Sequence, residues 1–227
     1  MENLKMKYNT IVITGSNGST ATGLINYFSN ISHNVIGVTR TVRQEYKQSN
    51  VSILTADMEK LNEVETVASE IKNKFSSIDI WINCVGGFAM GSSIKDDDNE
   101  NWDKMYSMNF LTCLNGSRAA LKYMVDQEDG HLINIGSEAA VDGFPGAAAY
   151  LVSKSSVHML TRLISLENKE NNITANVMLP GIIDTRANRN AMPNEDYSTW
   201  QTPKQIAQKI ERTVDEKCDG MLVRITD

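Results

Sequence analysis

Residues 10–21 read TIVITGSNGSTA, and this stretch decides the fold. The apolar run over 10–14 predicts a short strand that is buried on both faces, because such a strand needs no alternation of apolar and polar residues. A glycine-containing turn follows, and Leu24, Ile25 and Phe28 then form one stripe at helical spacing. The stretch therefore predicts a strand, a tight turn and a helix over about 19–30.

The same alternation of strand and helix continues along the chain. Further strands are predicted over 35–39, 51–54, 78–83, 131–135, 174–179 and 221–225, and helices over about 58–75, 99–127, 149–168 and 203–217. Thr202 and Pro203 suit the N-cap and first position of the last helix. Strands that alternate with helices imply right-handed crossovers and a parallel sheet. We expect one α/β domain over 1–227: a Rossmann-like, doubly wound parallel sheet of about seven strands with helices on both faces.

Composition argues against several kinds of partner. The formal net charge of the 227 residues is −6 and no basic cluster occurs, so neither nucleic acid nor a membrane surface is an expected partner. Cys84, Cys113 and Cys218 lack a CxxC spacing and a nearby histidine, so neither a disulfide framework nor a metal site is expected. No signal-peptide segment or membrane-spanning stretch is visible, which favours a cytoplasmic location.

The turn after the first strand has the composition of a dinucleotide-binding loop. Small residues allow a pyrophosphate to lie against backbone N–H groups at a helix N-terminus. Gly15 permits the tight turn, Gly18 and Ser19 keep the loop slim, and Ala21 lets the helix pack close to the strand. We therefore predict that the cofactor is contacted by six consecutive residues: Gly15, Ser16, Asn17, Gly18, Ser19 and Thr20.

The end of the second strand indicates which dinucleotide binds. An acidic residue at this place would bind the ribose 2′-hydroxyl of NAD, whereas an arginine accommodates the 2′-phosphate of NADP. The chain reads Thr39-Arg40-Thr41, without Asp or Glu. Pairing of Arg40 with the phosphate is therefore predicted, and NADPH/NADP+ is favoured over NAD. A solvent-facing Arg40 is the alternative.

Ser137, Tyr150 and Lys154 are the candidate catalytic residues. Tyr150 and Lys154 are four residues apart on a predicted helix and therefore share one face. A neighbouring ammonium lowers the pKa of a tyrosine, which suits general acid catalysis, and Ser137 follows a strand, where its hydroxyl can meet a substrate oxygen. For Tyr-x-x-x-Lys alone, a partly exposed tyrosine beside a solvated lysine would be the preferred interpretation.

Nearly the whole chain resembles the short-chain dehydrogenase/reductase family. The resemblance rests on the loop at 14–21, Asp57, Asn83-Cys84-Val85-Gly86, Asn109, the spacing of Ser137, Tyr150 and Lys154, and the Pro-Gly-x-x-x-Thr turn at 180–185. It implies that Tyr150 protonates a carbonyl oxygen, that Ser137 orients this oxygen and that Lys154 holds the nicotinamide ribose. It also implies that Asn109 belongs to the catalytic set by fixing a helix kink and a water.

The resemblance also implies cofactor contacts beyond the first loop. They come from Asp57 and Met58 near the adenine and from residues along the rest of the cleft: Asn83, Gly86, Tyr150, Lys154, Pro180, Gly181, Ile183 and Thr185. The chain departs from the family pattern at Ser19 and Ala21, where the family has glycine, which puts the affinity for the cofactor in doubt.

The full set of Ser137, Tyr150, Lys154 and Asn109 favours an NADPH-dependent carbonyl reductase that converts a ketone to an alcohol. Reduction of a quinonoid pterin is an alternative, because residues 139–146 and 191–200 are similar to the dihydropteridine reductases of the family. A catalytically silent, NADP-binding regulator is another. The substrate would be a small-molecule or carrier-linked carbonyl compound.

Residues 184–202 are predicted to be an irregular loop that covers the substrate. Within it, the polar candidates for an anionic substrate are Arg186, Asn188, Arg189 and Asn190, and an apolar wall is expected from Phe88, Met90 and Phe144. Finally, the resemblance implies a homodimer or homotetramer that associates through the long helices at 99–127 and 149–168.

Overall fold

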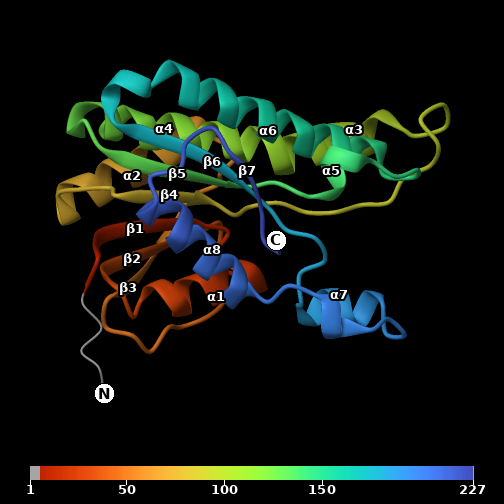
Figure 1. The fold of residues 1–227 in the computed structure, drawn as a ribbon, viewed down its shortest axis with the longest axis horizontal. Helices are drawn as coiled ribbons and strands as arrows, with labels where there is room; N and C mark the ends of the chain where they lie inside the picture. Colours follow the sequence, from red (N-terminus) through yellow and green to blue (C-terminus); the bar gives the residue numbers. More distant parts are fainter. Residues whose placement is uncertain (1–5, 227) are drawn as a thin grey trace.

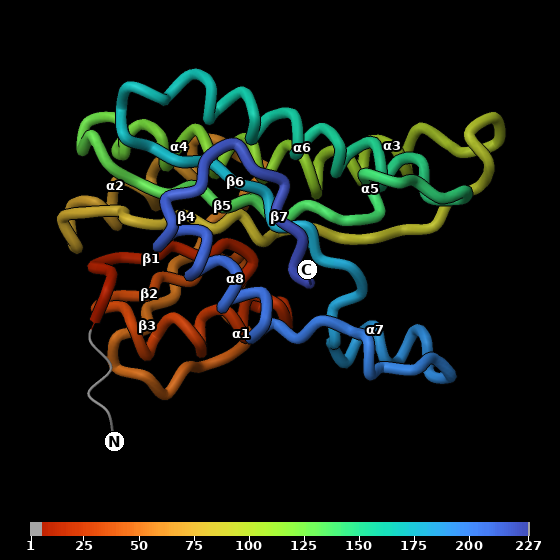
Figure 2. The backbone as a smooth tube through the Cα atoms, in the orientation of Figure 1, coloured from red at the N-terminus to blue at the C-terminus, as the bar shows by residue number. Residues whose placement is uncertain are grey.

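Seven parallel strands form the centre of the computed structural model, which describes residues 6–226 (Figure 1). The strands are β1 (Tyr8–Thr14), β2 (Ser32–Thr39), β3 (Val51–Thr55), β4 (Ile80–Asn83), β5 (Gly130–Ile135), β6 (Ile173–Leu179) and β7 (Leu222–Arg224). Their order in the sheet is β3-β2-β1-β4-β5-β6-β7, and all neighbours are parallel. In Figure 2, β4 runs beside β1 although about 65 residues separate them. The strand order reverses at this pair, as the doubly wound prediction requires.

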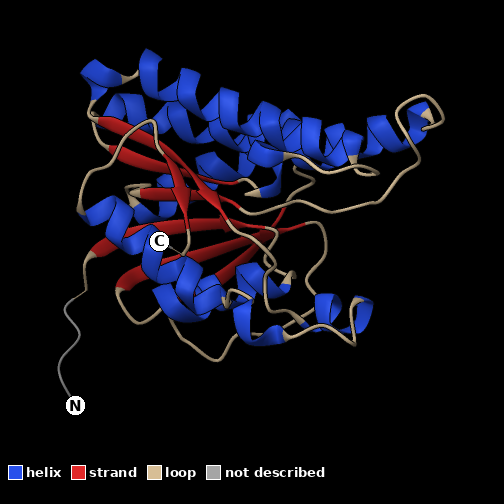
Figure 3. Cartoon of the chain, turned by 45° about the vertical axis from the view of Figure 1, so that its right-hand side comes forward, coloured by secondary structure: helices blue, strands red, loops and turns tan. Residues whose placement is uncertain are grey.

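Helices cover both faces of the sheet (Figure 3). One face carries α1 (Ser19–Phe28) and α8 (Pro203–Asp215), and the other carries α2 (Leu61–Phe75), α4 (Thr112–Gln127) and α6 (Ala148–Glu167). Because successive side chains of a strand point to opposite faces, Ile11 and Ile13 of β1 join the first core and Val12 joins the second. The strands therefore read as continuous apolar runs, and the predicted fold class is confirmed.

The predicted helix over 99–127 is interrupted in its middle. It consists of α3 (Asn99–Met105), a π-helical segment η1 (Tyr106–Leu111) and α4. A π-helical turn holds one more residue per hydrogen-bonded ring than an α-helical turn and is frequent at functional sites. The interruption coincides with Asn109, the residue for which the family resemblance implied a kink.

The start of α8 agrees with its sequence signal. Thr202 Oγ1 accepts a hydrogen bond from the Gln205 N–H at 3.2 Å, and Gln205 Oε1 accepts one from the Thr202 N–H at 2.8 Å. Pro203 occupies the first helical position. This reciprocal capping box satisfies two N–H groups that the helix itself leaves unpaired.

Four short helical elements were not predicted. They are α5 (Ala139–Asp142), η2 (Lys169–Asn171), α7 (Arg186–Ala191) and η3 (Tyr197–Thr199). The prediction of an irregular segment over 184–202 is wrong for α7 and η3, because a helix of six residues or fewer is too short to reveal its period. Between residues 6 and 226, none of the helices has both the length and the apolar character that crossing a bilayer requires.

Candidate active site

A cavity of about 810 Å³ lies at the carboxyl ends of the central strands. The segments after β1, β4, β5 and β6 contribute to its walls, and α5 and α7, which follow β5 and β6, both lie at the right-hand end of the sheet in Figure 1. This is where open α/β sheets bind their ligands. Ten of the predicted site residues line it: Ser19, Thr20, Gly86, Ser137, Tyr150, Lys154, Pro180, Gly181, Ile183 and Thr185.

The structure brings the three candidate catalytic residues together at this cavity. Tyr150 and Lys154 project from α6, and Ser137 follows β5. The Ser137 side chain lies close enough to the Tyr150 phenol for hydrogen bonding to lower the pKa of that phenol. Lys154 is buried, and its Nζ donates to the carbonyl oxygen of Ile135 at 2.8 Å. The ring of Phe88 packs edge-on against Tyr150, with ring centroids 5.0 Å apart.

The electrostatics of Tyr150 differ from the expectation. Burial raises the pKa of the Tyr150 phenol, and the hydrogen bond from Ser137 offsets part of that rise. Burial also lowers the pKa of Lys154. The expected lowering of the tyrosine pKa by the ammonium is not observed: burial and Ser137 account for the shift in the Tyr150 pKa, and Lys154 Nζ donates to the Ile135 carbonyl. Tyr150 therefore keeps its proton at neutral pH and can act as a proton donor.

Asn109 lies behind the catalytic residues in the π-helical segment. Its Oδ1 accepts from the Gly87 N–H at 2.9 Å, and its Nδ2 donates to Ser153 Oγ at 3.0 Å. A Cβ at Gly86 would lie 2.9 Å from this Oδ1 and 3.1 Å from Lys154 Nζ. Asn109 thus ties the turn after β4 to α6, and only glycine fits between Asn109 and Lys154.

The loop after β1 fits a dinucleotide pyrophosphate. Gly15 has a φ of +74°, and a Cβ there would lie 3.2–3.3 Å from atoms of Val85. The N-cap of α1 is Gly18, and no side chain caps the helix. The first N–H groups of α1 therefore remain available as donors to a phosphate, beside the cavity-lining Ser19 and Thr20.

Ser16 and Asn17 hold the neighbouring segment rather than facing the cavity. Asn17 Nδ2 donates to Thr39 Oγ1 at 2.8 Å and to the Thr41 carbonyl at 2.6 Å. The carbonyl of Ser16 accepts from Gln44 Nε2 at 2.5 Å and from the Tyr46 hydroxyl at 2.9 Å. These contacts fold residues 39–46 over the loop and fix the position at which Arg40 leaves β2.

Arg40 is paired with two carboxylates. Its Nε contacts Asp57 Oδ1 at 3.1 Å and its Nη2 contacts Glu59 Oε1 at 2.5 Å, while the side chain remains 59% exposed. The other oxygen of Glu59 accepts from Ser107 Oγ at 3.1 Å. Arg40 is thus both exposed to solvent and ion-paired, and a 2′-phosphate at Arg40 would have to share the guanidinium with Glu59, which the sequence pattern did not single out.

Two predicted cofactor contacts are not supported by side-chain positions. Asn83 is buried and bonded within the fold: it accepts from Trp81 Nε1 and donates to Ser117 Oγ and Asn134 Oδ1. Met58 is buried in the second core, and only its carbonyl is engaged, by Asn115 Nδ2. Both residues stand next to the cleft in sequence, but their side chains point into the layer between the sheet and α4.

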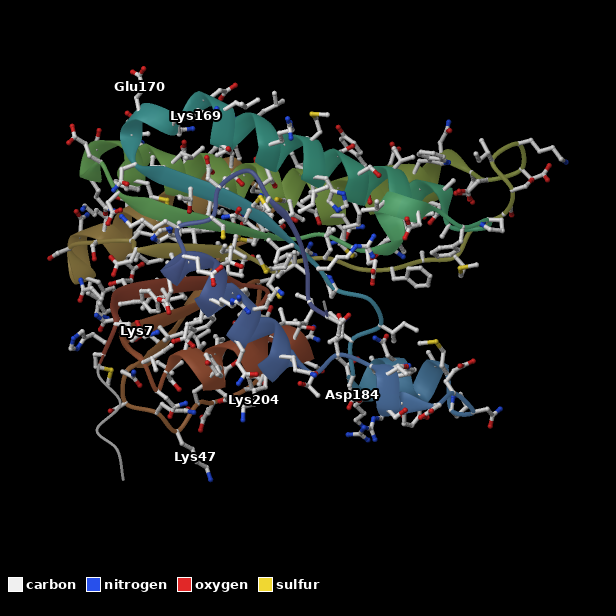
Figure 4. All side chains as sticks on the ribbon, viewed as in Figure 1. Lys7, Lys47, Lys169, Glu170, Asp184 and Lys204 are labelled. Carbon is white, nitrogen blue, oxygen red and sulfur yellow. The ribbon has the colours of Figure 1, made fainter. Side chains whose placement is uncertain are left out.

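The segment at 184–202 borders the cavity through Thr185, Ala187, Asn188 and Met192. Its two ends are held together, because the Asp184 N–H donates to the Gln201 carbonyl at 2.8 Å and the Gln201 N–H donates to the Ile182 carbonyl at 2.9 Å. Figure 4 labels Asp184 where the chain turns into α7. The segment is therefore a closed loop anchored at both ends.

Most of the polar candidates for an anionic substrate do not line the cavity. Arg189 pairs with both carboxylate oxygens of Asp184, at 2.6 and 2.8 Å, and its guanidinium lies over the ring of Tyr197. Arg186 and Asn190 are exposed, and neither they nor Arg189 lines the cavity. Of the four candidates, Asn188 lines it. Of the predicted apolar wall, Phe88 and Phe144 line the cavity and Met90 does not.

Sequence reasoning missed three ionisable residues of the site. Glu138 and Asp142 line the cavity. His158 lies behind it, where its Nε2 accepts from the Ser137 N–H at 3.4 Å, and burial together with the nearby Lys154 lowers its pKa to about 4. The position of Glu138 directly after Ser137, at the end of a parallel strand, was a usable signal. His158 shares the helix of Tyr150 and Lys154, four residues after Lys154, and this spacing was another.

Comparison with known proteins gives a consistent result. A family model described as short chain dehydrogenase matches residues 9–196. The chain is 29% identical over 231 residues to an uncharacterized oxidoreductase of Staphylococcus saprophyticus, covering 95% of this chain and 93% of that protein. An uncharacterized oxidoreductase of Staphylococcus aureus strain MRSA252 is 28% identical over 171 residues, or 75% of this chain and 73% of that one.

Solved structures share the fold at low identity. ElxO with NADP bound has a TM-score of 0.88 and 22% identity, with 96% of each chain covered. The ligand-free aldohexose dehydrogenase of Thermoplasma acidophilum has a TM-score of 0.85 and 21% identity, with 96% of this chain and 92% of that one covered. Similarity at this level of identity concerns the architecture.

Proposed function

Because the chain belongs to the short-chain dehydrogenase family and is an oxidoreductase of that family, we propose that it uses NADPH to reduce a ketone to an alcohol, with Tyr150 as the proton donor. The observation that carries this proposal is the joint position of Ser137, Tyr150 and Lys154 on one cavity. A regulator that only bound the cofactor would have no need of this set.

The chemistry divides between the cofactor and the chain. A bound reduced nicotinamide supplies a hydride to the carbonyl carbon. Ser137 holds the carbonyl oxygen, and Tyr150 gives its proton to that oxygen as negative charge develops there. Burial raises the pKa of Tyr150, so the phenol holds the proton that this step requires. Lys154 is held at the bottom of the cavity by its hydrogen bond to the Ile135 carbonyl. Asn109 holds the turn after β4 by accepting from the Gly87 N–H.

The residues that would hold the cofactor follow the cleft. The free N–H groups at the start of α1 would receive the pyrophosphate, Asp57 would face the adenine, and Arg40 would receive the 2′-phosphate. The nicotinamide end would meet Gly86, Pro180, Gly181, Ile183 and Thr185. The absence of an acidic residue at 39–41 supports NADPH over NADH, and the NADP-bound ElxO, which shares the fold, is consistent with this choice.

Replacement of Tyr150 tests the mechanism. We expect Tyr150→Phe to lower kcat for ketone reduction by about 10²–10⁴-fold, because the proton donor is lost. Binding of NADPH, measured by the change in its fluorescence, should remain within about fivefold of wild type, since a single neutral hydrogen bond contributes on the order of 1 kcal/mol. Tyr106→Phe is the matched control, because Tyr106 is exposed and does not line the cavity.

The same assay separates the alternatives. It should include aldehydes, ketones and a quinonoid dihydropterin, each with NADPH and with NADH. Wild-type turnover of ketones by Tyr150→Phe would contradict the mechanism. A preference for the pterin would favour the dihydropteridine reductase alternative, and NADPH binding without turnover of any compound would favour the regulator.

A further inference from the structure

The charges around the cavity restrict what it can hold. Among the residues that the structure describes, three charged side chains line it: Glu138, Asp142 and Lys154. Lys154 is buried at its base and donates to the Ile135 carbonyl. Glu138 and Asp142 belong to the segment that follows Ser137, so the wall next to the proton donor carries two carboxylates. Within residues 6–226, no arginine and no second lysine joins the lining.

The nearby arginines Arg224 and Arg189 are each paired with carboxylates of the protein. Arg224, on β7, is paired with Glu138, and its Nη2 is 3.9 Å from Asp142 Oδ2. Arg189 is held by Asp184 and lies over Tyr197. The charge of Glu138 is therefore largely compensated, whereas Asp142 makes only one long contact and its side chain is 69% exposed. Asp142 is the charge that a molecule entering the cavity meets.

The rest of the entrance is apolar. Phe88, Phe144 and Ile182 line the cavity and are 57%, 40% and 45% exposed. Met192 of the anchored loop joins them. Large apolar side chains that remain exposed around a concave site are typical of a surface that binds an apolar ligand. The Phe88 ring also touches Tyr150, so this apolar surface reaches the reacting position.

We propose that the substrate is an uncharged ketone that carries an aromatic or branched aliphatic group, and that Asp142 discriminates against anionic ketones. The apolar group would lie against Phe88 and Phe144. A carboxylate or phosphate on the substrate would find no cation in the lining except the buried Lys154, whose Nζ donates to the Ile135 carbonyl, and would face Asp142. This inference rests on the proposed function, since it concerns the substrate of the same site, and it replaces the expectation of an anionic substrate held by Arg186 and Arg189.

Two ketones that differ mainly in charge provide the test. Methyl benzoylformate and benzoylformate share the phenyl ring and the ketone, and only the second is an anion at pH 7. With saturating NADPH, we expect kcat/KM for the ester to exceed that for the acid by about tenfold or more, mainly through KM. The ratio should shrink as ionic strength rises, because salt screens the repulsion.

Variants test whether Asp142 causes the preference for the ester over the acid. Asp142→Asn should reduce the ratio of ester to acid by about threefold or more by lowering KM for the acid. Asp126→Asn is the matched control: Asp126 is an exposed aspartate on α4 that does not line the cavity, so the ratio should stay at the wild-type value. Thermal unfolding of both variants establishes that they are folded.

The outcomes distinguish the two proposals. Equal kcat/KM for the two ketones, a preference for the acid, or an unchanged ratio in Asp142→Asn would overturn the inference while Tyr150-dependent reduction still supported the proposed function. If neither ketone, nor any other neutral ketone, led to oxidation of NADPH or NADH, the proposed function would fail, and the inference would fail with it.

Discussion

At the scale of single residues, Glu59 controls the charge that Arg40 can offer to a cofactor. Its carboxylate occupies Nη2 of the guanidinium and is itself fixed by Ser107. A 2′-phosphate would approach Arg40 against the negative charge of this carboxylate. NADH carries no such phosphate, so we expect Glu59 to affect the choice between the two cofactors rather than dinucleotide binding in general.

Neutralising Glu59 should therefore improve the binding of NADPH and leave the binding of NADH unchanged. For Glu59→Gln we expect the Kd for NADPH to fall about fivefold, which corresponds to about 1 kcal/mol, the size of one exposed ion-pair interaction. The Kd for NADH should stay within about twofold, since the interaction concerns the phosphate. Titration monitored by nicotinamide fluorescence measures both, and Glu70→Gln, an exposed carboxylate on α2, is the control. Weaker NADPH binding would mean instead that Glu59 orients Arg40 for the phosphate.

His158 makes the stability of the protein depend on pH. Its pKa is about 4 in the folded protein against an ordinary value of 6.5, because burial and Lys154 disfavour the imidazolium. As pH falls below about 6.5, the unfolded chain takes up a proton at this residue and the folded protein does not. The free energy of unfolding therefore decreases between about pH 6.5 and 4, and is unaffected by His158 above that range.

Replacing His158 should flatten this part of the pH profile. In His158→Gln, whose side-chain oxygen can still accept from the Ser137 N–H, Tm should fall less between pH 6.5 and 4.5 than in the wild type. Denaturation followed by circular dichroism measures this difference. His33→Gln, at an exposed position of β2, should retain the wild-type profile. Parallel profiles for wild type and His158→Gln would show that the imidazole does not set this dependence.

At the scale of elements, Gln201 is the anchor of the loop at 184–202. Its backbone pairs with Ile182 and Asp184, and its buried side chain accepts from the Gly181 N–H at 2.9 Å through Oε1. One residue thus connects the end of the loop to the Pro180-Gly181 turn that lines the cavity. The position of the loop over the cavity depends on this connection.

Gln201→Ala should loosen the loop without abolishing the chemistry. Loss of the hydrogen bond to Gly181 is expected to cost about 1 kcal/mol of stability. KM for the ketone should rise more than kcat falls, because the loop borders the cavity and contributes no proton donor. Amide hydrogen exchange of 184–200 should become faster. Gln208→Ala, at an exposed position of α8, provides the control. Unchanged exchange and KM would mean that the backbone bridge alone holds the loop.

Elements with long apolar patterns were predictable from the sequence, and short or tertiary features were not. β1 and β4 read as apolar runs because both of their faces are buried, and the α8 start carries its own capping signal. α7 has six residues, too few to show a period. The pairing of Arg40 with Glu59 joins residues 19 apart across the ends of two strands, and no local pattern encodes it.

The catalytic residues could be predicted for a different reason. Tyr150 and Lys154 share a helix, and their spacing alone places them on one face. Ser137 was proposed from its position after a strand and Asn109 from family resemblance; both arguments gave positions in the chain and not hydrogen bonds. The predicted effect of Lys154 on the tyrosine was wrong for the same reason: the Ile135 carbonyl that engages the ammonium cannot be read from the spacing of side chains.

At the scale of the whole molecule, α6 presents an apolar face to solvent. Val152, Met159, Leu163 and Leu166 are each 46–58% exposed. On the other helical stretch for which association was expected, Met105 of α3 and Ala119 of α4 are buried. We propose that the face of α6 pairs with a second copy of the chain, in line with the oligomer that the family resemblance implied. In Figure 4, Lys169 and Glu170 follow this helix at the end of the molecule opposite α7.

A charge on this face should dissociate the oligomer. We expect wild-type protein to have two or four times the mass of one chain by light scattering, and Leu163→Glu to shift it toward one chain, because an unpaired charge is costly in an apolar interface. Ile94→Glu, an equally drastic change at an exposed apolar residue of the loop before α3, should leave the mass unchanged. Wild-type protein with the mass of a single chain would contradict the assignment.

The π-helical segment at Tyr106–Leu111 also constrains which insertions and deletions the chain can accept during evolution. Each residue of an α-helix advances the direction of the side chains by about 100°. The number of residues in this segment therefore determines how α3 is rotated about the helix axis relative to α4. The helix α3 packs on α6, whereas α4 packs on α2 and the sheet. Loss or gain of a residue between 106 and 111 would turn one of these helices away from its neighbours and move Asn109 off the turn after β4. Within a family that tolerates great divergence, we expect the length of this segment to vary less than its composition.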